Sequence, residues 1–188
     1  IDTWGVDFAL LDVHGEVVGN AYHYRDSRND GMPEEVFSIV PKSEIYESTG
    51  IQIMQINSIF QLYAFKTHHA EMMGSACSFV SLPNLFNYWL SGVIKNEYTI
   101  TTTTQLYNPT TKTWAYNLCD KLGFDRNLFG DIIFPGTVIG TIDSEVAAEI
   151  NAPKGLKIIA VGSHDTASAV TAVPVTENKN FAYISSGT

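Results

Sequence analysis

The sequence of 188 residues has little positive charge and little cysteine. It contains 11 Lys and Arg against 20 Asp and Glu, which gives a formal net charge of −9. This acidic balance argues against nucleic acids and anionic membranes as main partners, because both are negatively charged. Cys77 and Cys119 are far apart in the sequence, so they form neither a metal motif nor a disulfide framework. We expect both to be small buried thiols in a reducing, cytoplasmic compartment.

Long apolar runs and targeting signals are also missing. The longest apolar candidates are interrupted by Asp, His or Lys, so none has membrane-spanning length. No signal peptide opens the chain. His68-His69 has no third or fourth ligand nearby in the sequence, which argues against a zinc site there. The glycine-rich P-loop sequence and the dinucleotide-binding fingerprint are absent as well.

What remains is the composition of a folded domain, with 45% hydrophobic and 16% charged residues. The length suffices for one domain with a sizeable core. Apolar strand-like runs alternate with helix-like runs, and glycines 50, 92 and 123 end three of the helices. We expect strands at 8–12, 17–18, 76–82, 138–140, 157–161 and 181–184, and helices beginning at 33, 42, 58, 83, 114, 144 and 165. The first two strands would form a hairpin, and the alternation predicts an α/β fold.

The most informative segment is Ser163-His164-Asp165-Thr166, which lies between a strand-like run and a helix-like run. A carboxylate at such a junction lies where α/β proteins bind their ligands. The next strand-like run ends in Ser185-Ser186-Gly187-Thr188, a hydroxyl-rich turn whose backbone N–H groups could converge on an anion. An acid or base beside a phosphate cradle is suited to moving a phosphoryl group onto a hydroxyl.

Each of these residues also has a plainer interpretation. Asp165 stands where a helix N-cap would stand, and position alone favours the cap over a general base. His164 could be a core histidine, Gly5 a turn glycine, and Gly187-Thr188 an ordinary turn. These alternatives stay open at the level of residue patterns.

Six segments taken together narrow the interpretation. Their order and spacing along the whole chain resemble those of the FGGY carbohydrate kinases, and within that family the members that phosphorylate L-rhamnulose. No single segment would be specific. The segments are Asp2-Thr3-Trp4-Gly5-Val6-Asp7-Phe8, Tyr24-Arg25-Asp26-Ser27-Arg28, Glu97-Tyr98-Thr99 with Thr102-Thr103-Thr104-Gln105-Leu106, Pro135-Gly136-Thr137-Val138-Ile139-Gly140, Ser163-His164-Asp165-Thr166-Ala167-Ser168-Ala169-Val170, and Ser185-Ser186-Gly187-Thr188.

The resemblance implies a ribonuclease H-like ATPase fold of the actin, hexokinase and sugar kinase type, with the active site between two domains. Residues 1–188 would be most of the N-terminal domain, without its opening strands and without the C-terminal domain that holds adenosine. The chain starts within a strand-like run and stops within a turn. We therefore expect it to be part of a longer protein, and inactive as a kinase by itself. This fold binds phosphates through hairpin turns, so a missing P-loop sequence excludes little.

The implied reaction uses ATP and Mg²⁺ to phosphorylate the 1-hydroxyl of L-rhamnulose, giving L-rhamnulose 1-phosphate and ADP in L-rhamnose catabolism. The resemblance implies Asp165 as the catalytic base and Gly5, His164, Asp165 and Thr166 as contacts to the ketose. It implies Gly187 and Thr188 as contacts to the ATP phosphates. Glycine would suit a sugar contact because it lets a ligand approach the backbone closely.

Two alternatives remain beside this reading: another ketose or polyol kinase of the family, similar to a fuculokinase or xylulokinase, and a non-catalytic sugar-binding fragment. The oligomeric state is left open. We expect Gly5 to lie near residues 164–166 at one cleft, with the threonine run 101–104 close by. Asp26 and Arg28 would pair and support the sugar pocket, because residues two apart on an extended segment point to the same side.

Overall fold

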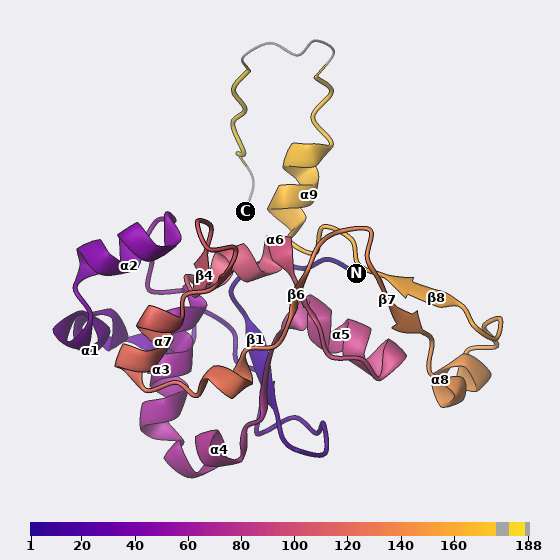
Figure 1. Cartoon of the computed structure of the whole chain (residues 1–188), viewed down its shortest axis with the longest axis horizontal. Coiled ribbons are helices and arrows are strands. Elements are labelled where there is room, and N and C mark those ends of the chain that lie inside the picture. Colours follow the sequence, from indigo (N-terminus) through magenta and orange to yellow (C-terminus); the bar gives the residue numbers. More distant parts are fainter. Residues whose placement is uncertain (176–180, 187–188) are drawn as a thin grey trace.

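The computed structural model of the chain describes residues 1–175 and 181–186. Helices and short strands alternate along it, so the α/β class predicted from the sequence is confirmed (Figure 1). The elements are, in order, β1 (Phe8–Leu11), η1 (Ser27–Asn29), α1 (Met32–Ile39), α2 (Lys42–Thr49), α3 (Ser58–His68), α4 (Ala70–Ser75), β2 (Ser78–Ser81), α5 (Leu82–Ser91), β3 (Asn96–Glu97), α6 (Tyr98–Thr101), η2 (Thr102–Thr104), β4 (Tyr107–Asn108), β5 (Thr113–Trp114), α7 (Tyr116–Leu122), η3 (Arg126–Leu128), β6 (Ile132–Ile133), β7 (Val138–Thr141), α8 (Ser144–Glu149), β8 (Lys157–Ile159) and α9 (Asp165–Thr171).

The antiparallel pair β1–β2 runs through the middle of the core, with Phe8 opposite Ser81 and Leu11 opposite Ser78. All four residues of β1 are buried. Successive side chains of a strand point to opposite faces. Phe8 and Leu10 accordingly belong to the larger apolar cluster, while Ala9 and Leu11 belong to a smaller one. Because both faces are covered, the strand is apolar throughout instead of alternating with polar residues.

The larger apolar cluster surrounds α3, which packs against α1 and carries Ile59, Phe60 and Leu62 without any exposed surface. Figure 1 shows α1, α2, α3 and α7 on one side of β1 and α5 on the other. The hairpin expected at 8–18 is reduced to one isolated bridge between Leu11 and Val17, and β2 is the regular partner of β1. The return strand ends early because Gly19 adopts a left-handed conformation with φ of 71°.

The glycine-capped helices match their sequence signals. Gly50, Gly92 and Gly123 follow α2, α5 and α7 directly, and each has φ between 66° and 70°. The prediction of a helix starting at Trp114 is wrong. Trp114 belongs to β5, pairs with Tyr107 of β4, and donates its indole N–H to the carbonyl of Gly130. These contacts hold the residue extended, and the helix begins at Tyr116.

The C-terminal part of the chain departs most from expectation. Residues 181–186 form no strand, and Ile184 is 92% exposed. Figure 1 shows this segment beyond α9, away from the core. A strand requires a neighbouring strand for its backbone hydrogen bonds, and no described residue supplies one here. The predicted phosphate contacts Gly187 and Thr188 lie outside the described residues.

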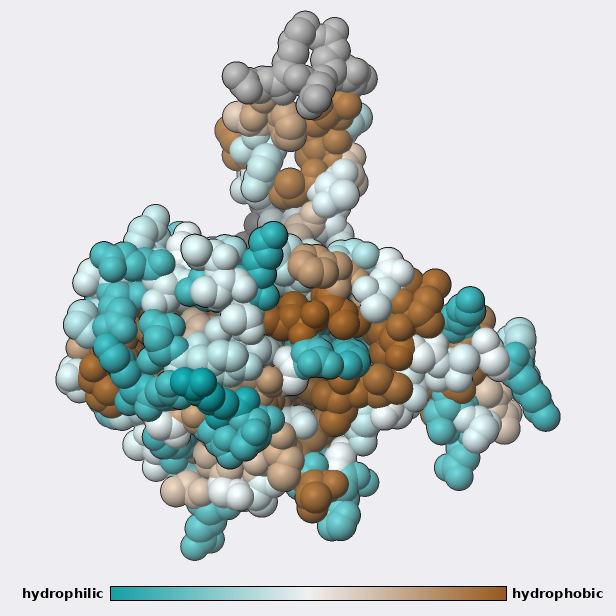
Figure 2. Space-filling model, in the orientation of Figure 1, coloured by the Kyte–Doolittle hydropathy of each residue, from teal (hydrophilic) through white to brown (hydrophobic). Residues whose placement is uncertain are grey.

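Strands β7 and β8 form an antiparallel pair joined through α8, and this unit extends to the side of the core (Figure 1). Its apolar residues Val138 and Ile159 are about half exposed, as is Trp89 of α5. Figure 2 shows an apolar surface where α5 and β7 lie in Figure 1. Among the residues that the structure describes, no helix is long and apolar enough to cross a membrane.

Both cysteines are free thiols. Cys119 is buried as predicted, and burial raises the pKa of its thiol to about 12. The prediction that Cys77 is buried is wrong, because this residue is exposed just before β2.

Candidate functional site

One cavity of about 360 Å³ brings together five separate parts of the chain. They are the segment before β1, the segment before η1, the loop between α2 and α3, η2, and the start of α9. Gly5, His164, Asp165 and Thr166 all line it, so the four residues selected as ketose contacts lie together. The volume is within the range of small-molecule sites. The other lining residues are Trp4, Val6, Tyr24, Ile51, Gln52, Met54, Ile56, Asn57, Thr102 and Thr103.

Backbone pairing between Thr3 and His164 places the first and last of these parts side by side. The Thr3 N–H donates to the Ser163 carbonyl over 3.0 Å, and the Asp165 N–H donates to the Thr3 carbonyl over 3.0 Å. These two bonds form a parallel bridge between segments about 160 residues apart in sequence. Gly5 comes two residues after Thr3, which explains why it lines the same cavity as Asp165.

Asp165 is the first residue of α9, and His164 holds the N-cap position. The alternative interpretation of Asp165 as the cap is therefore wrong by one position. Its Oδ1 atom accepts the Thr166 backbone N–H at 2.6 Å and the Thr166 hydroxyl at 3.2 Å. The Asp165 side chain is 52% exposed. A carboxylate is stabilised at the N-terminal end of a helix, and this one remains accessible from the cavity.

The imidazole of His164 lies beside this carboxylate, with Nε2 at 3.6 Å from Asp165 Oδ1. Burial lowers the pKa of His164 below its usual 6.5. The nearby carboxylates of Asp165 and Glu97 raise this pKa, but their effect is smaller than that of burial. At neutral pH the ring is therefore uncharged. A neutral imidazole offers one donor and one acceptor, which suits a sugar hydroxyl.

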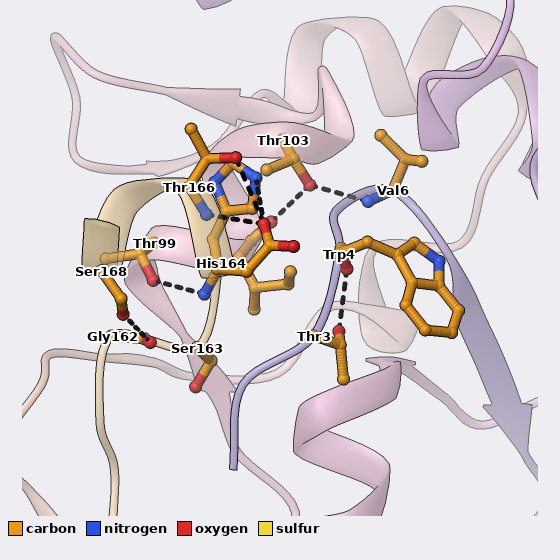
Figure 3. A network of polar contacts seen from close by, with 12 residues as sticks. Thr3, Trp4, Val6, Thr99, Thr103, Gly162, Ser163, His164, Thr166 and Ser168 are labelled. Atoms are coloured by element: carbon orange, nitrogen blue, oxygen red, sulfur yellow. Dashed lines mark hydrogen bonds and ion pairs between the residues drawn. The ribbon is translucent and has the colours of Figure 1, made fainter. Parts of the chain in front are cut away.

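Packing also favours glycine at position 5. A Cβ atom at this position would lie 3.0 Å from Cβ and Cγ2 of Thr103, closer than ordinary contacts allow. The Thr103 hydroxyl accepts the backbone N–H of Val6 at 3.0 Å (Figure 3). Val6 itself has a positive φ of 70°. The threonine run thus shapes the cavity wall through Thr103. The sequence indicated a position near the cleft for this run but not this contact.

Trp4 forms an apolar wall of the cavity and is 45% exposed. Its indole N–H donates to Asp7 Oδ2 at 2.8 Å, which fixes the plane of the ring. Asp7 is 2% exposed, and its burial raises its pKa despite the opposing hydrogen bonds from Trp4 and Gln61. An aromatic face of this kind can pack against the C–H face of a sugar.

The loop between α2 and α3 was missed by sequence reasoning as part of the site. Two buried amides hold it: Asn57 Nδ2 donates to the Gln52 carbonyl at 2.9 Å, and Gln105 Nε2 donates to the Ile51 carbonyl at 3.3 Å. The two side chains are joined by a bond of 2.7 Å from Asn57 Nδ2 to Gln105 Oε1. Asn57 holds the N-cap position of α3, but its side chain makes no cap bond. No sequence pattern indicates this pairing.

The expected pairing of Asp26 with Arg28 is wrong. Asp26 instead accepts the backbone N–H of Arg28 at 2.9 Å and caps η1. The Arg28 guanidinium lies 3.8 Å from the ring centre of Tyr22, and burial lowers its pKa. The prediction assumed an extended segment, whereas Ser27–Asn29 forms a 3₁₀ turn. Neither residue lines the cavity.

The phosphate and metal side of the implied reaction is less complete. Within residues 1–175 and 181–186, no three His, Cys, Asp or Glu side chains gather so that they could hold a metal ion. The described residues therefore offer no cluster of three such ligands for a resident metal ion. They provide a carboxylate, an imidazole and hydroxyls around a cavity suited to a polar small molecule.

Comparison with known proteins gives this geometry a family context. The model of the "FGGY family of carbohydrate kinases, N-terminal domain" matches residues 1–172. A rhamnulokinase of Oceanobacillus iheyensis is 46% identical over all 188 residues, which correspond to 39% of its own length. The chain spans 37% to 39% of the length of the curated rhamnulokinases it matches.

Two solved structures share the fold. The ligand-bound xylulose kinase of Lactobacillus acidophilus has a TM-score of 0.82 at 21% identity, covering 90% of this chain and 34% of that one. The glycerol kinase of Plasmodium falciparum with ADP has a TM-score of 0.76 at 18% identity, covering 90% and 34% respectively.

Proposed function

The chain belongs to the FGGY family of carbohydrate kinases, and on this premise we propose that it forms the sugar-binding and proton-accepting side of an ATP-dependent L-rhamnulose kinase. Its fold is the ribonuclease H-like α/β fold of actin, hexokinase and the sugar kinases. We further propose that residues 1–188 are most of the N-terminal domain of a longer enzyme.

The observation that carries the proposal is the convergence of Asp165, His164, Thr166 and Gly5 on one cavity. The identity of 43% to 46% with rhamnulokinases along the whole chain supports L-rhamnulose as the acceptor. The cavity combines this accessible carboxylate and neighbouring hydroxyls with an apolar wall formed by Trp4 and residues 51–56. This combination suits a ketose, which has both hydroxyl groups and C–H faces.

In the proposed reaction Asp165 is the general base. The oxygen of the ketose 1-hydroxyl bonds to the γ-phosphorus of ATP, the bond to the ADP oxygen breaks, and the hydroxyl proton passes to the carboxylate. Oδ1 already accepts two hydrogen bonds from Thr166, so we assign the proton to Oδ2. Neutral His164 and the Thr166 hydroxyl would orient the sugar through hydrogen bonds.

The phosphates and the adenosine of ATP would be held mainly by parts outside the described residues. Gly187 and Thr188 remain the proposed phosphate contacts in this chain. Mg²⁺, when bound, would offset the charge of the phosphates, and no step is assigned to a metal held by the described residues. The free thiol of Cys77 suits a reducing compartment, so we also propose a cytoplasmic location.

The proposal is tested with the full-length protein and a panel of ketoses and polyols. ADP release and the phosphorylated product are measured for L-rhamnulose, L-fuculose, D-xylulose and glycerol. We expect the highest kcat/KM for L-rhamnulose. A higher value for another sugar would keep the kinase class and change the acceptor, and no sugar-dependent ADP release with any of them would overturn the proposal.

A second measurement uses the chain of residues 1–188 by itself. We expect no sugar-dependent ADP release, because in-line transfer requires the phosphates to be held against the acceptor hydroxyl. Sugar-dependent release that disappears in an Asp165→Asn variant would show that this chain alone contains a complete phosphate site.

A further inference from the structure

We propose that Glu97 and Thr99 are positioning residues that hold the backbone of Ser163 and His164, and through it the Asp165 carboxylate, at the cavity. This inference rests on the proposed function and deepens it. Neither residue lines the cavity, and neither was singled out for a role by the sequence analysis.

Glu97 is a fully buried carboxylate, with 0% exposed surface. It accepts four hydrogen bonds: from the Thr99 N–H at 2.9 Å, the Thr99 hydroxyl at 2.7 Å, the Ile100 N–H at 3.2 Å and the Ser163 N–H at 3.1 Å. No Lys, Arg or His of the described residues forms a salt bridge with it. Burying a carboxylate is costly unless hydrogen bonds replace its water, and here they do.

Helix capping alone does not account for this carboxylate. The bonds from Thr99 and Ile100 cap α6, a role that a shorter Ser, Thr or Asn also performs at helix N-termini. The bond from Ser163 spans 66 residues and contributes nothing to the cap. A glutamate therefore joins the start of α6 to the segment that precedes α9.

Thr99 holds the next residue of the same backbone, His164, in the way that Glu97 holds Ser163. Its hydroxyl donates to Glu97 Oε2, so a lone pair of Oγ1 is left for the His164 N–H, which lies at 3.1 Å (Figure 3). On the opposite side, Thr3 bonds the backbone of Ser163 and Asp165. The backbone that leads into α9 is thus held between Thr3 on one side and Glu97 with Thr99 on the other.

Packing does not provide an alternative anchor for α9. None of its seven residues is buried. The position of Asp165 consequently depends on the hydrogen bonds before the helix and on the Ser168 hydroxyl, which donates to the Gly162 carbonyl at 2.6 Å. Displacing a catalytic group by about 1 Å can cost about 100-fold in rate. Removing the bonds from Glu97 or Thr99 should therefore slow turnover more than it weakens sugar binding.

The first test compares three threonine variants in the full-length kinase. Thr99→Val removes the hydroxyl that bonds His164, whereas Thr99→Ser retains it. Thr101→Val is the matched control, because the buried Thr101 hydroxyl in the same helix donates only to the Glu97 carbonyl. We expect Thr99→Val to lower kcat about 10- to 100-fold with KM for L-rhamnulose changed less than about threefold, and Thr99→Ser to restore most of kcat. Thr101→Val should retain kcat.

A second pair of variants tests the carboxylate of Glu97. Glu97→Asp can still cap α6 but is one methylene too short for Ser163, and Glu97→Gln keeps the length and removes the charge. We expect both to lower kcat at least as much as Thr99→Val. Equal kcat in Thr99→Val and Thr101→Val, or normal kcat in a folded Glu97→Asp protein, would overturn the proposal.

Amide hydrogen exchange separates this inference from the proposed function. In Thr99→Val the amides of Ser163 and His164 should exchange faster than in Thr101→Val, whatever the substrate of the enzyme. If the wild-type protein phosphorylates no sugar but exchange increases in this way, the proposed function fails and the connection to residues 163–164 stands. Unchanged exchange in Thr99→Val would overturn the connection even in an active kinase.

Discussion

The two walls of the cavity are held by different chemistry. The polar wall at residues 164–166 is held by a buried carboxylate, Glu97, and by backbone pairing with Thr3. The apolar wall comprises Trp4 and residues 51–56, and its segment 51–56 is held by the neutral amides of Asn57 and Gln105, which bond the carbonyls of Gln52 and Ile51. Hydrogen bonds to an ionised acceptor are roughly twice as strong as neutral ones.

This difference corresponds to what each wall is proposed to do. A general base must be positioned closely relative to the reacting hydroxyl, whereas an apolar wall only has to present a complementary surface. We therefore expect changes in the polar wall to act on kcat. Changes in the apolar wall should act on stability or on KM.

The largest expected effect is on the polar wall. Asp165→Asn should lower kcat of the full-length kinase by about 10²- to 10⁴-fold, the usual contribution of a general base. The asparagine Oδ1 can still accept from Thr166, so folding and KM should change little. Steady-state kinetics and thermal melting measure this, with Asp125→Asn, the exposed cap of η3, as control. Turnover close to wild type would leave Asp165 without a chemical role.

The next effect is on the support of the apolar wall. Gln105→Met should lower the free energy of unfolding by about 1–3 kcal/mol, because Asn57 and the Ile51 carbonyl lose a buried partner. Urea denaturation measures this, and kcat should stay close to wild type. Gln55→Met is the matched control, since Gln55 is exposed and, among the described residues, its side chain bonds only Asp30. A loss of kcat as large as that of Asp165→Asn would remove the distinction between the walls.

A smaller effect is expected at Trp4. Trp4→Ala should raise KM for the sugar about tenfold with little change in kcat, because a binding surface is lost but the base is retained. Trp4→Phe should raise KM less than Trp4→Ala does. Trp89→Ala removes a similarly exposed tryptophan from α5 and should leave KM unchanged. A decrease in kcat with unchanged KM for Trp4→Ala would contradict its assignment to the binding wall.

The smallest effect is the titration of His164. Its pKa is lowered in the folded protein, so the unfolded chain takes up the proton first as pH falls below 6.5. The contribution of His164 to stability is therefore full above this pH and is lost as pH falls through the folded pKa. NMR titration of the imidazole should give a value below 6.5, and His164→Asn should weaken the pH dependence of unfolding between pH 5 and pH 7, about the range in which histidine titrates. A value above 6.5 would contradict the dominance of burial.

Local signals allowed much of the secondary structure to be predicted. The ends of α2, α5 and α7 follow from glycines that alone adopt a left-handed cap easily, an interaction within a few residues. The junction at 163–166 was likewise recognisable, because an apolar strand precedes a helix there. Trp114 and residues 181–184 were predicted wrongly, since their state depends on distant partners: Tyr107 and Gly130 for the first, and a neighbouring strand for the second.

The sequence by itself determined the fold class, the family and the chemical groups of the site, because these depend on residue types and on their order. It did not determine what holds those groups in place. Three contacts join residues that are 66 to 161 positions apart: the bridge from Thr3 to His164, the bond from Ser163 to Glu97 and the packing of Thr103 against Gly5. Only the tertiary structure decides such contacts, because chain separation carries no information about which distant groups will satisfy a buried carboxylate or fill the space beside a glycine.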